Sequence, residues 1–135
     1  MEASCQCGKL SASIADDAEP LTILCHCTDC QKRSGSTFGV TGYFAKQAVE
    51  ISGAAREWTR NSDFGNRLTN GFCPTCGSTV YVLLERTESL IGVPVGAISD
   101  PAFPAPTREV WTNRKHHWVN IPDGMASFEK GFDKK

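Results

Sequence analysis

The chain has 135 residues, of which 40% are hydrophobic and 21% are charged, and its formal net charge is −1. This composition is typical of a folded globular domain and argues against disorder. The near-neutral charge argues against binding to nucleic acid or to an anionic membrane surface. The first residues, MEASCQCGKL, lack the apolar core of a signal peptide, and no run reaches membrane-spanning length. We therefore expect a cytoplasmic protein.

Short alternating stretches indicate β-strands along most of the chain. In chain order, the two-residue period or a short β-prone run occurs at residues 10–14, 38–44, 49–51, 80–84, 90–93 and 109–111. Turn signals separate these stretches at residues 52–53, 70–71, 99–101 and 122–124. One or two helical turns are expected between Asp29 and Ser34, ending before Gly35. The pattern predicts a mostly-β single domain over residues 1–135.

Seven cysteines fall into three tight groups along the chain: Cys5 and Cys7; Cys25, Cys27 and Cys30; Cys73 and Cys76. Disulfide bonds would leave one cysteine over, and the reducing cytoplasm keeps thiols reduced. Metal ligation is the better interpretation of this spacing.

The outer two groups form what we call the four-cysteine cluster: Cys5, Cys7, Cys73 and Cys76. Each pair is followed by a glycine, Gly8 or Gly77, which suits a tight turn with positive φ around a metal. Two such pairs predict a closed tetrahedral zinc site whose binding energy contributes to folding. The alternative is a set of buried cysteines without a metal.

The middle group, the three-cysteine cluster, differs: Cys25, Cys27 and Cys30 have no closing glycine. Cys30 would sit at the start of the expected helical turn, where the helix dipole favours a thiolate. Three thiolates on a zinc ion leave a net negative charge, which the neighbouring Lys32 and Arg33 would soften. Three protein ligands with one open position are typical of a catalytic zinc site.

Other interpretations of the three-cysteine cluster remain open. A fourth ligand, making the site purely structural, would come from His26, Asp29, His116 or His117. His26 is the least favoured because a residue between two ligands tends to point away from the metal. Asp29 would alternatively cap the helical turn. A redox dithiol formed by Cys27 and Cys30 is the remaining alternative.

The residues that follow the three-cysteine cluster are candidates for substrate binding. Ser34, Gly35 and Ser36 would offer hydroxyl and backbone N–H groups to an anionic ligand, or form only a turn. Lys32 and Arg33 would meet carboxylates of such a ligand.

The order of these motifs is similar to that of a known family. CxCG, then CHCxxC followed by QKRSGSTF, then RLTNGFCPTCGS, VPVGAISDPAFPAP and RKHHW resemble the glutathione-dependent formaldehyde-activating (GFA) family, which includes centromere protein V. The resemblance covers about residues 5–128. The chain departs from the family pattern at residues 114–117 (RKHH), which are more basic than is usual in the family.

The resemblance implies a β-tent fold of short strands with two Zn²⁺ ions per chain. The four-cysteine cluster would hold the structural zinc and the three-cysteine cluster the catalytic one. The implied reaction adds glutathione to formaldehyde to give S-hydroxymethylglutathione, catalysed by an enzyme classed as a carbon–sulfur lyase. The expected partners are a small thiol such as glutathione and a small aldehyde, without nucleic acid or membrane. The alternative is a non-catalytic zinc-binding module for a protein partner. The sequence indicates neither the oligomeric state nor the physiological substrate.

Overall fold

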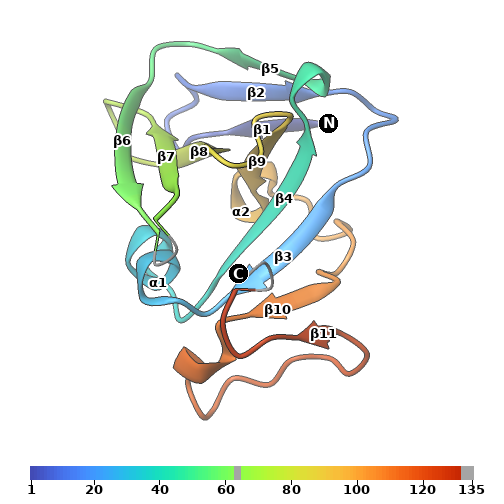
Figure 1. Cartoon of the computed structure of the whole chain (residues 1–135). Helices are drawn as coiled ribbons and strands as arrows, with labels where there is room; N and C mark the ends of the chain where they lie inside the picture. The colour runs from blue at the N-terminus through green and yellow to red at the C-terminus, as the bar shows by residue number, and fades with distance from the viewer. Residues whose placement is uncertain (63–64, 132–135) are drawn as a thin grey trace. The chain divides into compact units, whose positions relative to one another are not determined.

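The structure is a computed structural model of the chain that describes residues 1–62 and 65–131 (Figure 1). Strands hold 40% of the residues and helices 13%, which confirms the mostly-β prediction. Internal contacts divide the chain into two compact units, residues 1–20 with 42–103, and residues 21–41 with the chain from 104 onward. Each cysteine cluster lies within one unit.

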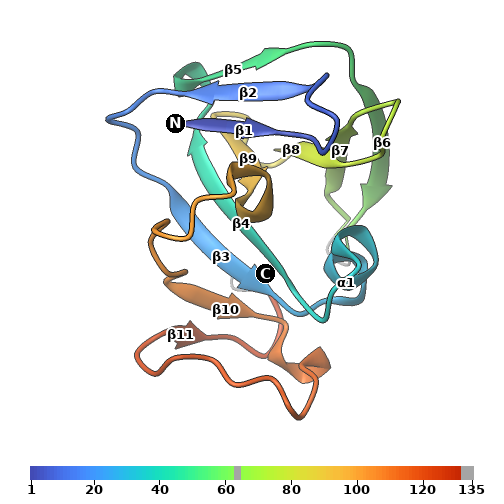
Figure 2. The ribbon, with the colours of Figure 1, turned by 180° about the vertical axis from the view of Figure 1, so that it is seen from behind.

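The first unit carries most of the strands. Its elements are β1 (Glu2–Ser4), β2 (Ser11–Ile14), the end of β4 (Gly39–Ala45), the 3-10 helix η1 (Lys46–Ala48), β5 (Val49–Ser52), β6 (Arg56–Asn61), β7 (Arg67–Phe72), β8 (Thr79–Leu84), β9 (Leu90–Pro94) and α2 (Val95–Ile98). Strands β1, β2 and β5 form an antiparallel sheet and lie side by side in both views (Figure 1 and Figure 2). The other strands follow the order β4-β9-β8-β7-β6.

The core of the first unit includes two of the cysteines. Leu10, Ala12 and Ile14 are all buried, as their two-residue period predicted. They pack in one hydrophobic cluster with residues of β1, β4, β8, β9 and α2, and with Cys5 and Cys73. The four-cysteine cluster is therefore anchored in this core.

The second unit is smaller and contains a parallel arrangement. Its elements are β3 (Leu21–Cys25), α1 (Thr28–Ser34), the start of β4, β10 (Arg108–Val110), the 3-10 helix η2 (Thr112–Arg114) and β11 (Ala126–Ser127). Strand β10 pairs in parallel with β3 on one side and with β11 on the other. The register places Val110 opposite Cys25, so β10 runs beside the strand that leads into the three-cysteine cluster.

One predicted turn is wrong. Asn70 and Gly71 lie inside strand β7, where Gly71 stands opposite Tyr81 of β8. A Cβ atom at Gly71 would lie 2.1 Å from the Tyr81 ring, so this glycine makes room for a side chain and forms no turn. Strands β1, β3, β6, β7 and β11 were not predicted.

Across the described residues, the structure contains no helix that combines the length and the apolarity needed to span a membrane.

Candidate metal centres

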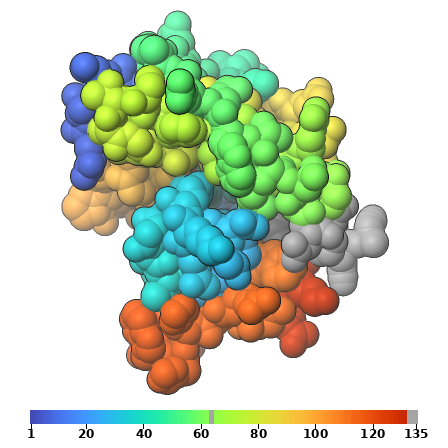
Figure 3. All heavy atoms as spheres, turned by 90° about the vertical axis from the view of Figure 1, so that its left-hand side faces the viewer, coloured from blue at the N-terminus to red at the C-terminus, as the bar shows by residue number. Residues whose placement is uncertain are grey.

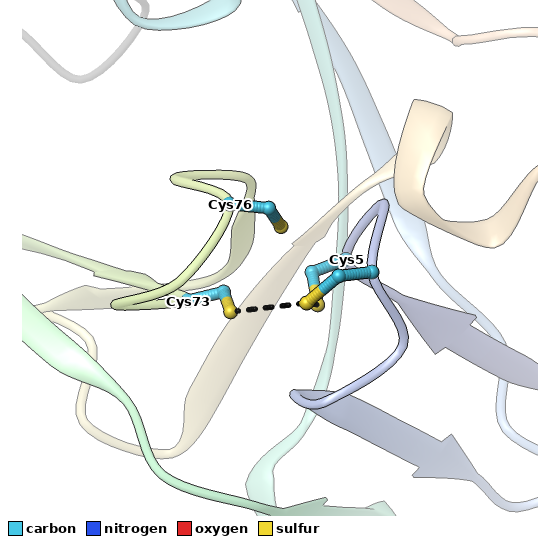
Figure 4. A group of neighbouring side chains, drawn as sticks. Cys5, Cys73 and Cys76 are labelled. Atoms are coloured by element: carbon cyan, nitrogen blue, oxygen red, sulfur yellow. Dashed lines mark hydrogen bonds between the residues drawn. The ribbon is translucent and has the colours of Figure 1, made fainter.

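The four sulfur atoms of the four-cysteine cluster converge in the first unit. All lie within 4.8 Å of one another, although the cysteines come from two segments about 70 residues apart in sequence. Sγ of Cys7 is 3.7 Å from Sγ of Cys5 and 3.6 Å from Sγ of Cys73. Figure 4 shows the Cys5, Cys73 and Cys76 side chains pointing toward a common centre.

Two similar turns present these sulfurs. Gly8 and Gly77 both adopt a φ of 83°, the left-handed conformation that the closing glycines were expected to supply. The Gly8 N–H donates to the Cys5 carbonyl at 3.1 Å, and the Gly77 N–H donates to the Cys73 carbonyl at 2.8 Å. Each glycine thus closes its own turn locally.

Backbone N–H groups also point at the first sulfur of each turn. The Leu10 N–H donates to Sγ of Cys5 at 3.3 Å, and the Thr75 N–H donates to Sγ of Cys73 at 3.3 Å. Such donors stabilise a thiolate, which is the form of cysteine that binds metal.

Ser78 links the two turns. Its hydroxyl accepts a hydrogen bond from the Gln6 N–H at 3.1 Å and lies 3.4 Å from Sγ of Cys76. Hydrogen bonds from the Ser78 hydroxyl and backbone lower the pKa of Cys76 to about 5. The Cys76 thiol therefore favours its ionised form, the thiolate, at neutral pH.

The donor set fits a tetrahedral metal ion. A Zn–S bond of about 2.3 Å in a tetrahedron places neighbouring sulfurs about 3.8 Å apart. The distances of 3.6 and 3.7 Å are close to this spacing. The residues therefore fit a closed four-thiolate site.

The three-cysteine cluster gathers where β3 meets α1 in the second unit. Cys25 ends β3, Cys27 caps α1, and Cys30 lies in the first turn of that helix. Their sulfurs lie within 4.8 Å of one another. The Cys27 N–H is 3.5 Å from Sγ of Cys25, and the Cys30 N–H donates to Sγ of Cys27 at 3.3 Å. Helix α1 therefore brings the Cys30 sulfur close to the sulfurs of Cys25 and Cys27.

Helix α1 appears where one or two helical turns were expected. It spans Thr28–Ser34 and ends at Gly35, which has a φ of 71°. The alternative in which Asp29 caps the turn is wrong because the capping side chain is that of Cys27.

Among the residues that the structure describes, the three-cysteine group takes in no further cysteine, histidine or carboxylate within 4.8 Å. The His26 ring is fully buried, and its Nε2 donates to Oε2 of Glu109 at 2.7 Å. The His116 Nε2 donates to Oε1 of Gln31 at 3.0 Å. The histidine and aspartate side chains proposed as a fourth ligand therefore do not complete this group.

Crowding of the sulfurs makes ionisation without a cation unfavourable. Hydrogen bonds with Cys27 and Cys30, together with burial, raise the pKa of Cys25. For Cys30, the hydrogen bond with Cys25 lowers the pKa, but the bond with Cys27, burial and the Cys27 charge outweigh it and raise the pKa to about 11. A bound divalent cation would offset the repulsion between the three thiolates. A thiol that coordinates such a cation is deprotonated. The thiolate set fits a metal with three protein ligands.

The two basic residues next to the cluster are not equivalent. Arg33 is half-buried, and its Nη2 lies 2.9 Å from where a Cβ at Gly39 would stand. That position is also 3.4 Å from Cβ of Cys30, and the guanidinium charge acts to lower the pKa of that cysteine. Lys32 is exposed. Of these two residues, Arg33 is therefore the one that lies beside Cys30.

The Ser34 side chain makes hydrogen bonds within the loop that follows α1. The Ser34 hydroxyl is 3.2 Å from the Phe38 carbonyl and accepts from the Ser36 N–H at 3.1 Å. Ser34, Gly35 and Ser36 are all exposed. Their predicted role in binding a ligand stays a prediction.

A separate cavity of about 420 Å³ lies in the first unit. No cysteine contributes to its lining, which consists of Lys46, Thr59, Arg67, Thr69, Leu83, Leu84, Glu85, Glu88 and Leu90. This cavity is not part of either cysteine cluster.

Sequence reasoning missed the side chains that surround His26. Glu109 is only 4% exposed and accepts hydrogen bonds from His26, Lys115 and Ser127. Burial acts to raise the pKa of Glu109, but the bonds from Lys115, His26 and Ser127 outweigh it and lower the pKa. The available signal was an acidic residue in an apolar strand, which suggests a buried partner.

These features define a small, mostly-β protein with two cysteine clusters that can hold metal ions. The chain belongs to the glutathione-dependent formaldehyde-activating enzyme family, whose model matches residues 1–114. A comparison with curated proteins finds no match. A crystal structure of a Rhodobacter sphaeroides protein, a structural genomics target, is similar to the chain with a TM-score of 0.54 and 18% identity. The match covers 95% of this chain and 99% of that one, and at this identity it indicates the fold alone.

Proposed function

We propose that this protein is a zinc-dependent enzyme that joins a small thiol to a small aldehyde, with glutathione and formaldehyde as the substrates. The product would be S-hydroxymethylglutathione. A carbon–sulfur bond forms, and the thiol proton is transferred overall to the aldehyde oxygen. Read in the reverse direction, the activity is that of a carbon–sulfur lyase. Membership of the family supports this choice of substrates.

One observation carries the proposal. The three sulfurs of the three-cysteine cluster converge without a fourth cysteine, histidine or carboxylate from the described residues. When bound there, zinc would supply an open position that acidifies a thiol or polarises a carbonyl group. The four-cysteine cluster supplies a full set of four ligands and suits a structural role.

The side chains beside the cluster would bind and orient the thiol substrate. Arg33 places a cation next to Cys30, where it would attract an anionic substrate and offset the charge of the thiolates. Lys32 and the exposed residues Ser34, Gly35 and Ser36 would contact its more distant carboxylates.

The test is to follow adduct formation from ¹³C-formaldehyde and glutathione by NMR exchange spectroscopy. We expect the zinc-loaded protein to accelerate interconversion above the spontaneous rate. The Cys27→Ser variant, in which one sulfur of the cluster is lost, should return to the spontaneous rate. A protein that holds two zinc ions but accelerates no combination of small thiols and aldehydes would instead support a non-catalytic zinc-binding module.

A further inference from the structure

Of the four basic residues 114–117, the outer two are exposed and the inner two are half-buried. Arg114 and His117 are exposed, whereas Lys115 and His116 are half-buried. In Figure 3 the orange C-terminal segment of the second unit lies directly against the cyan residues around α1. His116 makes the contact with α1 through Gln31, whereas Lys115 contacts Glu109 of β10.

Lys115 reaches His26 through a buried carboxylate. Its Nζ donates to Oε2 of Glu109 at 2.9 Å, and the same oxygen accepts from Nε2 of His26 at 2.7 Å. The Ser127 hydroxyl donates to the other oxygen of Glu109 at 3.0 Å. The carboxylate is thus fixed at both oxygens, and it fixes the histidine ring.

His116 reaches the same residue through the helix. Its Nε2 donates to Oε1 of Gln31 at 3.0 Å, and Nε2 of Gln31 donates to the His26 carbonyl at 2.7 Å. The His26 N–H in turn donates to the Val110 carbonyl at 3.1 Å. His26 is therefore held at its ring, its carbonyl and its N–H.

His26 stands between two residues of the three-cysteine cluster, Cys25 and Cys27. The hydrogen bonds to the His26 ring and carbonyl restrict rotation of the backbone at His26. These rotations set the directions in which the Cys25 and Cys27 side chains point. We propose that Lys115 and His116 are positioning residues for this cluster, acting on His26 through Glu109 and Gln31. The inference rests on the proposed function only in requiring that the cluster bind a metal ion.

The need for such support follows from the contrast between the two clusters. Each turn of the four-cysteine cluster is closed by its own glycine, Gly8 or Gly77. The three-cysteine cluster has no closing glycine and one ligand fewer, so its affinity depends more on holding the sulfurs in place. Side chains that orient metal ligands from outside typically change metal affinity by about 10–100-fold.

The experiment titrates the zinc-loaded protein with a chromophoric chelator. The equilibrium transfer of zinc gives the affinity of each site, and the release rate separates a labile ion from a tight one. A Cys25→Ser variant assigns the labile phase to the three-cysteine cluster. The test variant is Lys115→Met with His116→Phe, which removes both connections. The matched control is Arg114→Met with His117→Phe, which likewise removes one cation and one histidine, but at the two exposed positions.

We expect the test variant to bind zinc at the three-cysteine cluster about 10–100-fold more weakly than wild type. The control variant should match wild type, and the tight ion should be unaffected in both. Lys115→Arg with His116 unchanged should bind zinc nearly as tightly as wild type, because a cation still meets Glu109.

Loss of Lys115 leaves a buried carboxylate without its cation, and this change alone can impair folding. His116→Phe and Gln31→Leu therefore test the second connection by themselves, and each should weaken the labile site while the unfolding midpoint of the metal-free protein stays near that of wild type. Unchanged affinity in these folded variants would overturn the proposal. Absence of zinc from the three-cysteine cluster of wild type would overturn both this inference and the metal requirement of the proposed function. Normal zinc binding without thiol–aldehyde activity would count against the proposed function alone.

Discussion

At the scale of single residues, the surroundings of the three-cysteine cluster separate neighbours that look alike in the sequence. Arg33 occupies the space that Gly39 leaves open and lies beside Cys30, whereas Lys32 is exposed. A charge close to the sulfurs and partly shielded from water interacts more strongly than one in solvent. The two basic residues should therefore contribute unequally to the binding of an anionic thiol.

The Arg33→Gln substitution should weaken glutathione binding several-fold, because a partly buried charge next to the site is lost. The remaining binding should be less sensitive to salt concentration. Lys32→Gln is the matched control and should change the affinity by less than about twofold, as expected for a surface charge. Calorimetric titration of the zinc-loaded proteins at two salt concentrations measures both effects. Equal losses in the two variants would show that only the net charge of the helix matters.

At the scale of elements, strand β7 depends on a glycine that the sequence pattern assigned to a turn. Gly71 stands opposite Tyr81, whose ring covers the position of a Cβ atom. The Tyr81 side chain is fixed in place: it is 8% exposed, and its hydroxyl donates to Glu57 at 2.6 Å. Burial and the Glu57 hydrogen bond raise the pKa of Tyr81, so the hydroxyl keeps the proton that it donates.

We expect Gly71→Ala to lower the free energy of unfolding by about 1–3 kcal/mol, the usual range for overpacking. The ring would have to move, and the hydrogen bond to Glu57 would be strained. Gly96→Ala in α2 is the matched control: apart from its chain neighbours and its own helix, no described residue places an atom within 4 Å of the added Cβ. Alanine favours a helix over glycine by up to about 1 kcal/mol. Urea unfolding of both variants measures the difference. Equal stability would mean that the Tyr81 ring shifts at little cost.

At the scale of the whole molecule, the two clusters should contribute differently to folding. Cys5 and Cys73 belong to the hydrophobic core of the first unit, whereas the three-cysteine cluster is half-buried and contributes to no core cluster among the described residues. Structural zinc sites supply roughly 10 kcal/mol or more of apparent binding energy. Stability should therefore depend mainly on the four-cysteine cluster.

Wild-type protein should contain two zinc ions per chain. Cys76→Ser should give insoluble or molten protein, because three thiolates around a core site lose their fourth partner. Cys27→Ser should stay folded, retain one zinc ion and keep an unfolding midpoint close to that of wild type. Metal analysis and near-UV circular dichroism of the purified variants test this difference. Folded Cys76→Ser protein with wild-type stability would reverse the roles that we assign to the clusters.

The sequence by itself determined the features that depend on local spacing. The grouping of the cysteines and the glycines after two of the pairs predicted a closed cluster and a glycine-free one. The sulfurs do gather in these two sets, and Gly8 and Gly77 adopt positive φ. Alternation at residues 10–14 predicted β2 and its buried face correctly. These signals are readable because metal turns and strand faces are set by residues only a few positions apart.

Only the tertiary structure decided which side chains surround the three-cysteine cluster. Strand β10 pairs with β3 across more than 80 residues, and this parallel register brings Glu109 to His26. The sequence pattern at residues 114–117 indicated a basic run, without showing that two of its members face inward. The turn predicted at residues 70–71 was wrong for the same reason, because the role of Gly71 depends on a ring from the neighbouring strand. Contacts between distant segments leave no periodic trace in the chain, so only the packed structure reveals them.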